Sequence, residues 1–289
     1  MIAMSGAELR KTSVGDCELA WWERAGLEAS DAPPLVVAHA TGFHGRCYDP
    51  IVEHFPDRRV LQLDMRGHGR SGGGPIADWR VFAGDIAAVL DTSGVSGAVG
   101  VGHSMGAHSL LQAAAERPDL FNRLVLFDPV ILAPDYYADP SPMGEHPTAR
   151  RKADFESVEQ MIERFGDRDP YDIFDRRVFE LYCRFGLVPK DNGEGLTLAC
   201  APQTEASIYQ SSRSNGAIFD AARKVDIPVL VVRAQQRDGM DFKGSPTWPE
   251  LASIIPDGTD LHRPDMTHFH PFQDPADAAR IVSEYLGTS

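Results

Sequence analysis

Short, continuously apolar runs recur along the chain, and each one ends in a loop of glycine or polar residues. Runs of this kind are typical of strands that are covered on both faces of a sheet. Segments with apolar residues at helical spacing lie between several of them, which predicts alternating strands and helices. The expected strands cover Glu18–Glu23, Pro34–Ala40, Arg59–Met65, the run that begins at Ala98, Leu124–Phe127, Ile227–Arg233 and a short stretch near Leu261. The expected helices cover Asp78–Asp91, the segment after Ser104 and Ala276–Leu286.

This alternation predicts an α/β fold with a doubly wound, mostly parallel sheet. One interval, Val130–Lys224, contains broken helical patterns and no strong strand pattern. A loop of that length is uncommon in a compact domain, so the interval is expected to form structure of its own. We therefore predict a core made of residues 1–129 and 225–289, with residues 130–224 inserted as a helical cap.

The segment AVGVGHSMGAHSLLQAAA, from Ala98 to Ala115, contains the pattern Gly-x-Ser-x-Gly between a predicted strand and a predicted helix. In that setting the serine lies on a sharp, strained turn that exposes its hydroxyl, and the glycines let strand and helix approach each other. Negative charge that develops there also lies near a helix N-terminus. Ser104 is therefore the candidate nucleophile.

Composition limits the partners and the compartment. The 289 residues carry a formal net charge of −14, which does not favour binding to nucleic acid or to an anionic membrane surface. No run is long and apolar enough for a membrane span and the N-terminus lacks a secretory pattern, so we expect a cytoplasmic protein that acts on a small molecule. The four cysteines have no paired spacing, which argues against a disulfide framework or a zinc site. Both a monomer and a homodimer remain open.

Three further motifs accompany the serine motif along the chain. His39-Ala40-Thr41-Gly42-Phe43 follows an early strand, Asp64–Ser71 (DMRGHGRS) follows the next one, and Thr267-His268-Phe269 precedes the last helix. Together these motifs resemble the α/β-hydrolase superfamily, and the resemblance covers nearly the whole chain apart from the cap. Two places depart from the family pattern. Ala40 stands where glycine is more frequent, and the loop after the Ile227–Arg233 strand is a loose version of the usual acid loop.

The resemblance implies a catalytic triad in the chain order nucleophile, acid, histidine. His268 lies where that order puts the base, and His270 would point to the opposite side of an extended segment. Two aspartates remain open as the acid. We favour Asp238, which follows the strand where the superfamily usually has the acid, over Asp128, which ends the strand before the cap. Asp241 is a weaker third candidate in the same loop as Asp238.

An oxyanion hole needs two backbone amides aimed at the developing negative charge. The Met105 amide is expected to supply one, and the loop after the early strand the other, with Phe43 and Thr41 as candidates. No cofactor is implied, and the histidine spacing predicts no metal site. Three other motif histidines are expected to brace loops: His39, His68 and His103.

The cap is expected to determine substrate choice because it would cover Ser104. Most of its aromatic side chains are expected to form the cap's own core, with Tyr136 and Tyr137 as candidates for contact with substrate. The charged run Ala149–Asp154 is interpreted as a solvated helix face.

These features lead us to expect a serine hydrolase that cleaves small to medium apolar carboxylic esters or lactones through an acyl-enzyme. Two alternatives stay open. The same triad suits a carbon–carbon bond hydrolase acting on a diketone-type product of ring cleavage, and the fold also allows a non-catalytic small-molecule sensor.

Overall fold

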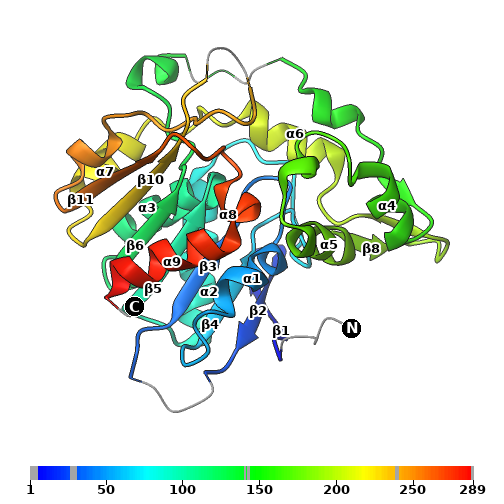
Figure 1. Ribbon diagram of the computed structural model, residues 1–289, viewed down its shortest axis with the longest axis horizontal. Helices are drawn as coiled ribbons and strands as arrows, with labels where there is room; N and C mark the ends of the chain where they lie inside the picture. Colours follow the sequence, from blue (N-terminus) through cyan, green and yellow to red (C-terminus); the bar gives the residue numbers. More distant parts are fainter. Residues whose placement is uncertain (1–5, 27–30, 140, 142–143, 238–240, 288–289) are drawn as a thin grey trace.

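The computed structural model of the chain describes residues 6–26, 31–139, 141, 144–237 and 241–287. Its main sheet is built from β1 (Glu8–Val14), β2 (Cys17–Arg24), β3 (Leu35–Ala38), β4 (Val60–Asp64), β5 (Ala98–His103), β6 (Phe121–Phe127), β10 (Val229–Ala234) and β11 (Gly258–Arg263). These strands follow the order β1-β2-β4-β3-β5-β6-β10-β11 (Figure 1). β1 and β2 form an antiparallel hairpin, and β2 is antiparallel to β4. From β4 to β11 all neighbours are parallel.

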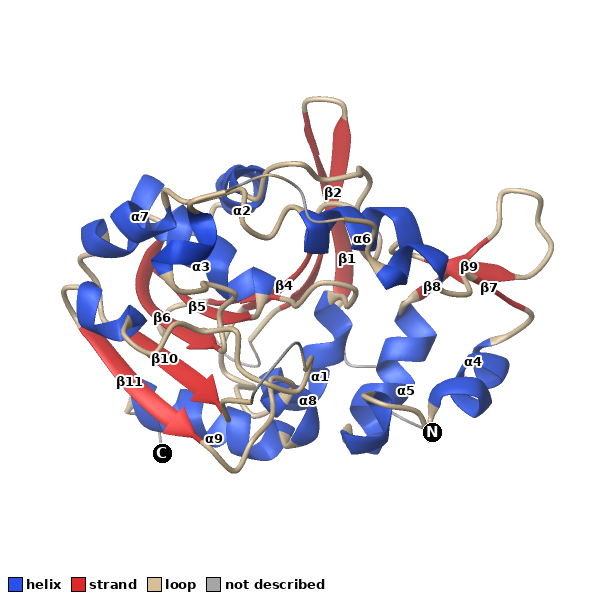
Figure 2. Cartoon of the chain, turned by 90° about the horizontal axis from the view of Figure 1, so that it is seen from above, coloured by secondary structure: helices blue, strands red, loops and turns tan. Residues whose placement is uncertain are grey.

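Helices cover both faces of this sheet because its inner strands are apolar on both sides. Successive side chains of a strand point to opposite faces, and in β3 Leu35 packs into one core while Val36 packs into the other. Figure 2 shows the two helical layers on opposite sides of the sheet. One layer contains α2 (Arg80–Ser93), α3 (Met105–Glu116) and α7 (Ile218–Lys224), and the other contains α1 (Asp49–Val52), α8 (His270–Gln273) and α9 (Pro275–Leu286).

Every strand and helix expected for the core is present, within a few residues of the expected bounds. The α/β fold with a mostly parallel sheet is thereby confirmed. The sheet differs from expectation at one edge, because β1 precedes β2 and takes the edge position. The side chains of β1 are mostly exposed and polar, so its sequence lacks the apolar run that marked the other strands.

Between β6 and β10 the chain forms a separate layer beside the sheet (Figure 1). It contains short helices together with a three-stranded antiparallel sheet in the order β7-β9-β8, where only helices were expected. The last helix of the interval, α7, packs against α3 and so belongs to the layer that covers the main sheet. The elements before α7 are η2 (Pro134–Tyr137), η3 (Pro147–Arg150), β7 (Asp154–Phe155), α4 (Val158–Phe165), η4 (Tyr171–Ile173), α5 (Arg176–Phe185), β8 (Leu187–Pro189), β9 (Leu196–Leu198) and α6 (Pro202–Gln210). We call the segment from η2 to α6 the cap.

Two short 3-10 helices complete the core, η1 (Gly45–Tyr48) after β3 and η5 (Leu251–Ile254) before β11. Within the described ranges, none of the helices is both long and apolar enough to cross a bilayer.

Candidate active site

Ser104 occupies the turn that joins β5 to α3, with a backbone conformation of φ 57° and ψ −119°. Residues other than glycine rarely adopt a positive φ. The turn is this tight because the helix starts directly against the sheet. A Cβ on Gly106 would lie 2.1 Å from the carbonyl oxygen of Ala38, and a Cβ on Gly102 would lie 2.5 Å from the Cα of Ala107. Both glycines of the motif are therefore required by contact with neighbouring backbone.

His268 connects the serine to a carboxylate. Its Nε2 lies 3.0 Å from the Ser104 hydroxyl oxygen, and its Nδ1 lies 2.5 Å from Oδ2 of Asp128. The three residues come from the loops after β5, β6 and β11, which all end at the same edge of the parallel sheet. Their exposed fractions are 5%, 9% and 2% for Ser104, His268 and Asp128. The structure thus brings the candidate nucleophile, a candidate base and a candidate acid together in one buried, hydrogen-bonded row.

The Asp128 carboxylate is held from its other side. Oδ1 accepts hydrogen bonds from the backbone amide of Ala234 at 3.0 Å and from the hydroxyl of Ser245 at 2.5 Å. Asp128 itself has a φ of 47°, a conformation that aspartate tolerates better than most residues. These contacts leave Oδ2 facing the imidazole.

The acid that contacts His268 differs from the one favoured by the sequence. Asp238 lies outside the described residues. Asp241 is turned away, because its carboxylate accepts hydrogen bonds from the Arg237 side chain and from the Lys243 amide. β6 and β10 are neighbours that end at the same edge, so an aspartate after either strand could reach the histidine. The loop after β10 instead supplies Ser245, a partner of Asp128 that no motif in the sequence marks.

The other histidines near the site have structural partners. His270 Nε2 lies 2.8 Å from the carboxylate of Asp277, so it does not compete with His268. His103 accepts a hydrogen bond from the Tyr48 hydroxyl and donates one from Nε2 to the His268 carbonyl oxygen, both at 2.8 Å. Burial lowers the pKa of His103 well below its usual value, so its ring is neutral.

His39 and His68 brace the loops on which they lie. His39 accepts a hydrogen bond from the Met65 amide, and His68 accepts one from the Gly42 amide at 3.0 Å. Burial lowers the pKa of both rings, for His68 to about 4. Neutral rings with both nitrogens engaged are fixed spacers between loops.

The backbone amides near Ser104 differ in whether their N–H group already donates a hydrogen bond. The Phe43 amide already donates to the Ala40 carbonyl at 3.1 Å, and the Gly42 amide donates to His68. In the part of the chain that the structure describes, the amides of Thr41 and Met105 have no hydrogen-bond acceptor. Of the two loop candidates for an oxyanion hole, Thr41 therefore has the free amide.

The cap residues singled out from the sequence do not contact the triad. Tyr136 is 59% exposed, and the Tyr137 ring packs edge-on against Phe219 of α7. The interpretation of Ala149–Asp154 as a solvated helix face is wrong, because only Ala149 and Arg150 lie in a helix, η3, while Asp154 belongs to β7 and Arg151 is largely buried. Only 18% of the Arg151 side chain is exposed, because it forms an ion pair of 2.7 Å with Glu205 of α6. No periodicity in the sequence marks this pairing, since 54 residues separate the two side chains.

Comparison with known proteins assigns the chain to a family. A family model described as the alpha/beta hydrolase family matches residues 35–281, which is most of the chain. The chain belongs to the alpha/beta hydrolase family.

Two relatives of this alpha/beta hydrolase match different shares of the chain. The 2-(acetamidomethylene)succinate hydrolase of Mesorhizobium japonicum is 25% identical over 240 residues, covering 81% of this chain and 83% of that protein. Lipase LipV of Mycobacterium tuberculosis is 36% identical over 99 residues, but the match spans only 34% of this chain and 37% of LipV.

Solved structures agree with the fold along nearly the whole chain. The crystal structure of E-2-(acetamidomethylene)succinate hydrolase has a TM-score of 0.74 at 21% identity, covering 97% of this chain and 99% of that one. The enol-lactonase from Burkholderia xenovorans LB400 has a TM-score of 0.68 at 19% identity, covering 96% of this chain and all of that one. At such identities the likeness shows the fold.

The close approach at the serine turn makes a prediction about stability. We expect Gly106→Ala to lower the free energy of unfolding by about 2–3 kcal/mol, because its Cβ meets rigid backbone. Gly84 in α2 is the matched control, since no atom lies within 4 Å of a Cβ added there. Gly84→Ala is expected to raise stability by about 0.5–1 kcal/mol through helix propensity. Urea unfolding followed by circular dichroism measures both, and equal stability of Gly106→Ala and wild type would contradict the packing described.

The contact of Asp128 with His268 predicts which aspartate is needed for ester hydrolysis. Asp128→Asn is expected to lower kcat for p-nitrophenyl acetate hydrolysis by about 10³–10⁴-fold, because an amide no longer fixes the histidine tautomer. Asp238→Asn and Asp241→Asn are expected to keep kcat within about threefold, because Asp128 already contacts Nδ1 of His268. A large loss in Asp238→Asn with little loss in Asp128→Asn would reverse the assignment.

Proposed function

We propose that this alpha/beta hydrolase is a serine hydrolase that cleaves small to medium carboxylic esters or lactones through an acyl-enzyme. The observation that carries the proposal is the buried hydrogen-bonded row of Ser104, His268 and Asp128 on a strained turn. A serine hydroxyl is a weak nucleophile at neutral pH, and a base in hydrogen-bond contact activates it. We propose His268 as that base and Asp128 as the acid that orients it.

In the first half of the reaction, the Ser104 oxygen attacks the carbonyl carbon while His268 Nε2 takes the hydroxyl proton. The imidazole becomes positively charged, and the Asp128 carboxylate stabilises it through Nδ1. His268 then gives the proton to the leaving alcohol, which departs and leaves an acyl-enzyme. In a lactone the leaving oxygen stays tethered to the acyl group.

Two backbone amides are proposed to hold the negative oxygen of the tetrahedral intermediate. Met105, at the first position of α3, is one, and Thr41 is the other, since both amides lack an acceptor among the described residues. Donors that are already in place need no reorganisation when charge develops, which is the basis of oxyanion stabilisation. Phe43 is not proposed, because its amide is bound to the Ala40 carbonyl.

In the second half, a water molecule replaces the alcohol. His268 takes a proton from this water, which attacks the acyl carbon and releases the acid, and Ser104 regains its proton. Several relatives are named for reactions of this type, among them Esterase YbfF of Escherichia coli and the enol-lactonase above. Their names support acyl chemistry for this chain without fixing its substrate.

The proposal predicts p-nitrophenyl ester hydrolysis that depends on one serine. Ser104→Ala is expected to lower kcat by about 10⁵–10⁶-fold, because removal of the nucleophile leaves only the oxyanion hole and binding. Ser109→Ala is the matched control, since Ser109 is buried in the same helix and its hydroxyl donates to the Met105 carbonyl at 2.8 Å. Its activity is expected to stay within about threefold of wild type.

A fluorophosphonate probe provides the second measurement. Labelling of wild type but not of Ser104→Ala supports an activated serine, and ester turnover in the same sample supports the proposed reaction. Labelling without ester turnover would direct the search to carbon–carbon bond substrates. Neither labelling nor turnover would favour a small-molecule sensor and would refute the proposal.

A further inference from the structure

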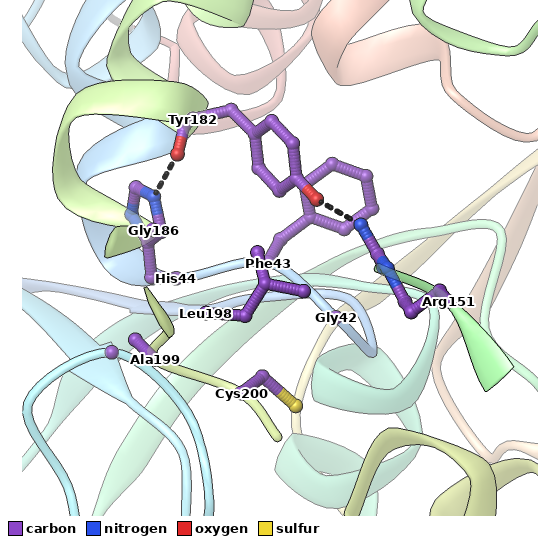
Figure 3. A pocket seen from close by; sticks show the side chains of 10 residues that line it. Gly42, Phe43, His44, Arg151, Tyr182, Gly186, Leu198, Ala199 and Cys200 are labelled. Carbon is purple, nitrogen blue, oxygen red and sulfur yellow. Dashed lines mark hydrogen bonds between the residues drawn. The ribbon is translucent and has the colours of Figure 1, made fainter. Parts of the chain in front are cut away.

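A small pocket lies between the cap and the loop that follows β3 (Figure 3). Gly42 and Phe43 form its wall on the core side, and Arg151 and Leu198 line it from the cap. Gly42 directly follows Thr41, and consecutive Cα atoms are about 3.8 Å apart. One wall of the pocket is therefore formed by the residue that follows the amide that we propose for the oxyanion hole.

Arg151 supplies the charge among the side chains that line this pocket. Phe43 and Leu198 are apolar. Burial raises the pKa of the Cys200 thiol well above its usual value and lowers the pKa of His44 to about 3, so both are neutral. A ligand that fits these walls is mostly apolar and carries a hydrogen-bond acceptor that can pair with a guanidinium.

The Arg151 guanidinium is held in a fixed orientation. Nη1 donates to the Glu205 carboxylate at 2.7 Å, and Nη2 donates to the hydroxyls of Tyr182 at 2.9 Å and Tyr171 at 3.3 Å. Figure 3 shows the guanidinium beside the Tyr182 hydroxyl, at the side of the pocket. A guanidinium carries five N–H donors, so these three hydrogen bonds leave donors for a ligand.

Glu205 is the ionic partner of Arg151. Its carboxylate balances the charge of Arg151 within the cap, and its Oε1 lies close to Gly42, where an added Cβ would come within 2.6 Å of it. Burial raises the pKa of Glu205. A raised pKa makes protonation of Glu205 easier, and protonation would reduce its repulsion of an anion bound beside it.

We infer that this pocket binds a carboxylate carried by the substrate, and that Arg151 selects for it. Resting on the proposed acyl hydrolysis, the inference names the substrate class as acyl compounds in which a short apolar spacer separates the scissile carbonyl from a free carboxylate. Both hydrogens of Nη2 and one of Nη1 are already engaged, so a carboxylate would accept one charge-assisted hydrogen bond, from Nε or from the second hydrogen of Nη1. Such a bond is stronger than one between neutral groups.

The test compares two esters that differ in this one group. Mono-p-nitrophenyl glutarate has a free carboxylate at the end of its acyl chain, and p-nitrophenyl pentanoate has the same number of acyl carbons without it. We expect wild type to prefer the glutarate ester in kcat/KM. Arg151→Gln is expected to lower kcat/KM for the glutarate ester by about 10- to 100-fold, the usual worth of a hydrogen bond to a charged group. The pentanoate value should remain within about threefold.

Two further variants separate selection from folding. Arg150→Gln is the matched control, because Arg150 is 74% exposed and pairs with Glu145 at 3.0 Å. It should leave both esters unchanged. Arg151→Gln combined with Glu205→Gln removes the buried charges together, so that no unpaired charge remains to destabilise the fold. This double variant should keep its thermal midpoint and still lose the preference for the glutarate ester.

Each outcome bears on the inference. An equal loss for both esters in Arg151→Gln and in the double variant would mean that Arg151 only supports the cap, and would overturn it. Hydrolysis of neither ester by wild type would refute the proposed function rather than the pocket. Calorimetry with glutarate itself then decides: binding that Arg151→Gln abolishes and Arg150→Gln retains supports the pocket, and no binding to wild type overturns it.

Discussion

The site depends on one close approach, that of the first turn of α3 to the end of β3. Only a hydrogen atom fits between Gly106 and the Ala38 carbonyl. This contact brings the strand-to-helix turn that carries Ser104 beside the loop that carries Thr41. The candidate nucleophile and the two amides proposed for the oxyanion hole therefore lie on neighbouring segments. The positive φ of Ser104 is the conformational cost of this arrangement, and packing of α3 against the sheet holds it in place.

Much of the core could be predicted because its signals are local. The inner strands are apolar on both faces, and the serine motif constrains a turn through steric limits that act over five residues. His268 could be assigned because it is the motif histidine after the last strand. The edge strand β1 escaped prediction, since it is exposed and pairs with a single neighbour.

The acid and the cap arginine depend on contacts between distant segments. β6 and β10 lie side by side, so sequence order alone could not decide which loop would supply the carboxylate. The sequence predicts that Arg151 is exposed, because the residue lies in a charged run. Its burial follows from Tyr182 and Glu205, which lie 31 and 54 residues further along the chain. Only the packing of η3 against α6 and the contact of Arg151 with Tyr182 of α5 reveal it.

His103, the residue between Gly102 and Ser104 in the serine motif, connects the segments that carry the triad. His103 joins the Tyr48 hydroxyl to the backbone carbonyl of His268, and its neutral ring is fully buried. The turn that carries the nucleophile thereby also anchors the backbone that carries the base. Hydrogen bonds made within the core therefore link the Ser104 turn to the backbone of His268. Because no cap residue takes part in these hydrogen bonds, a change in the shape of the cap leaves them in place.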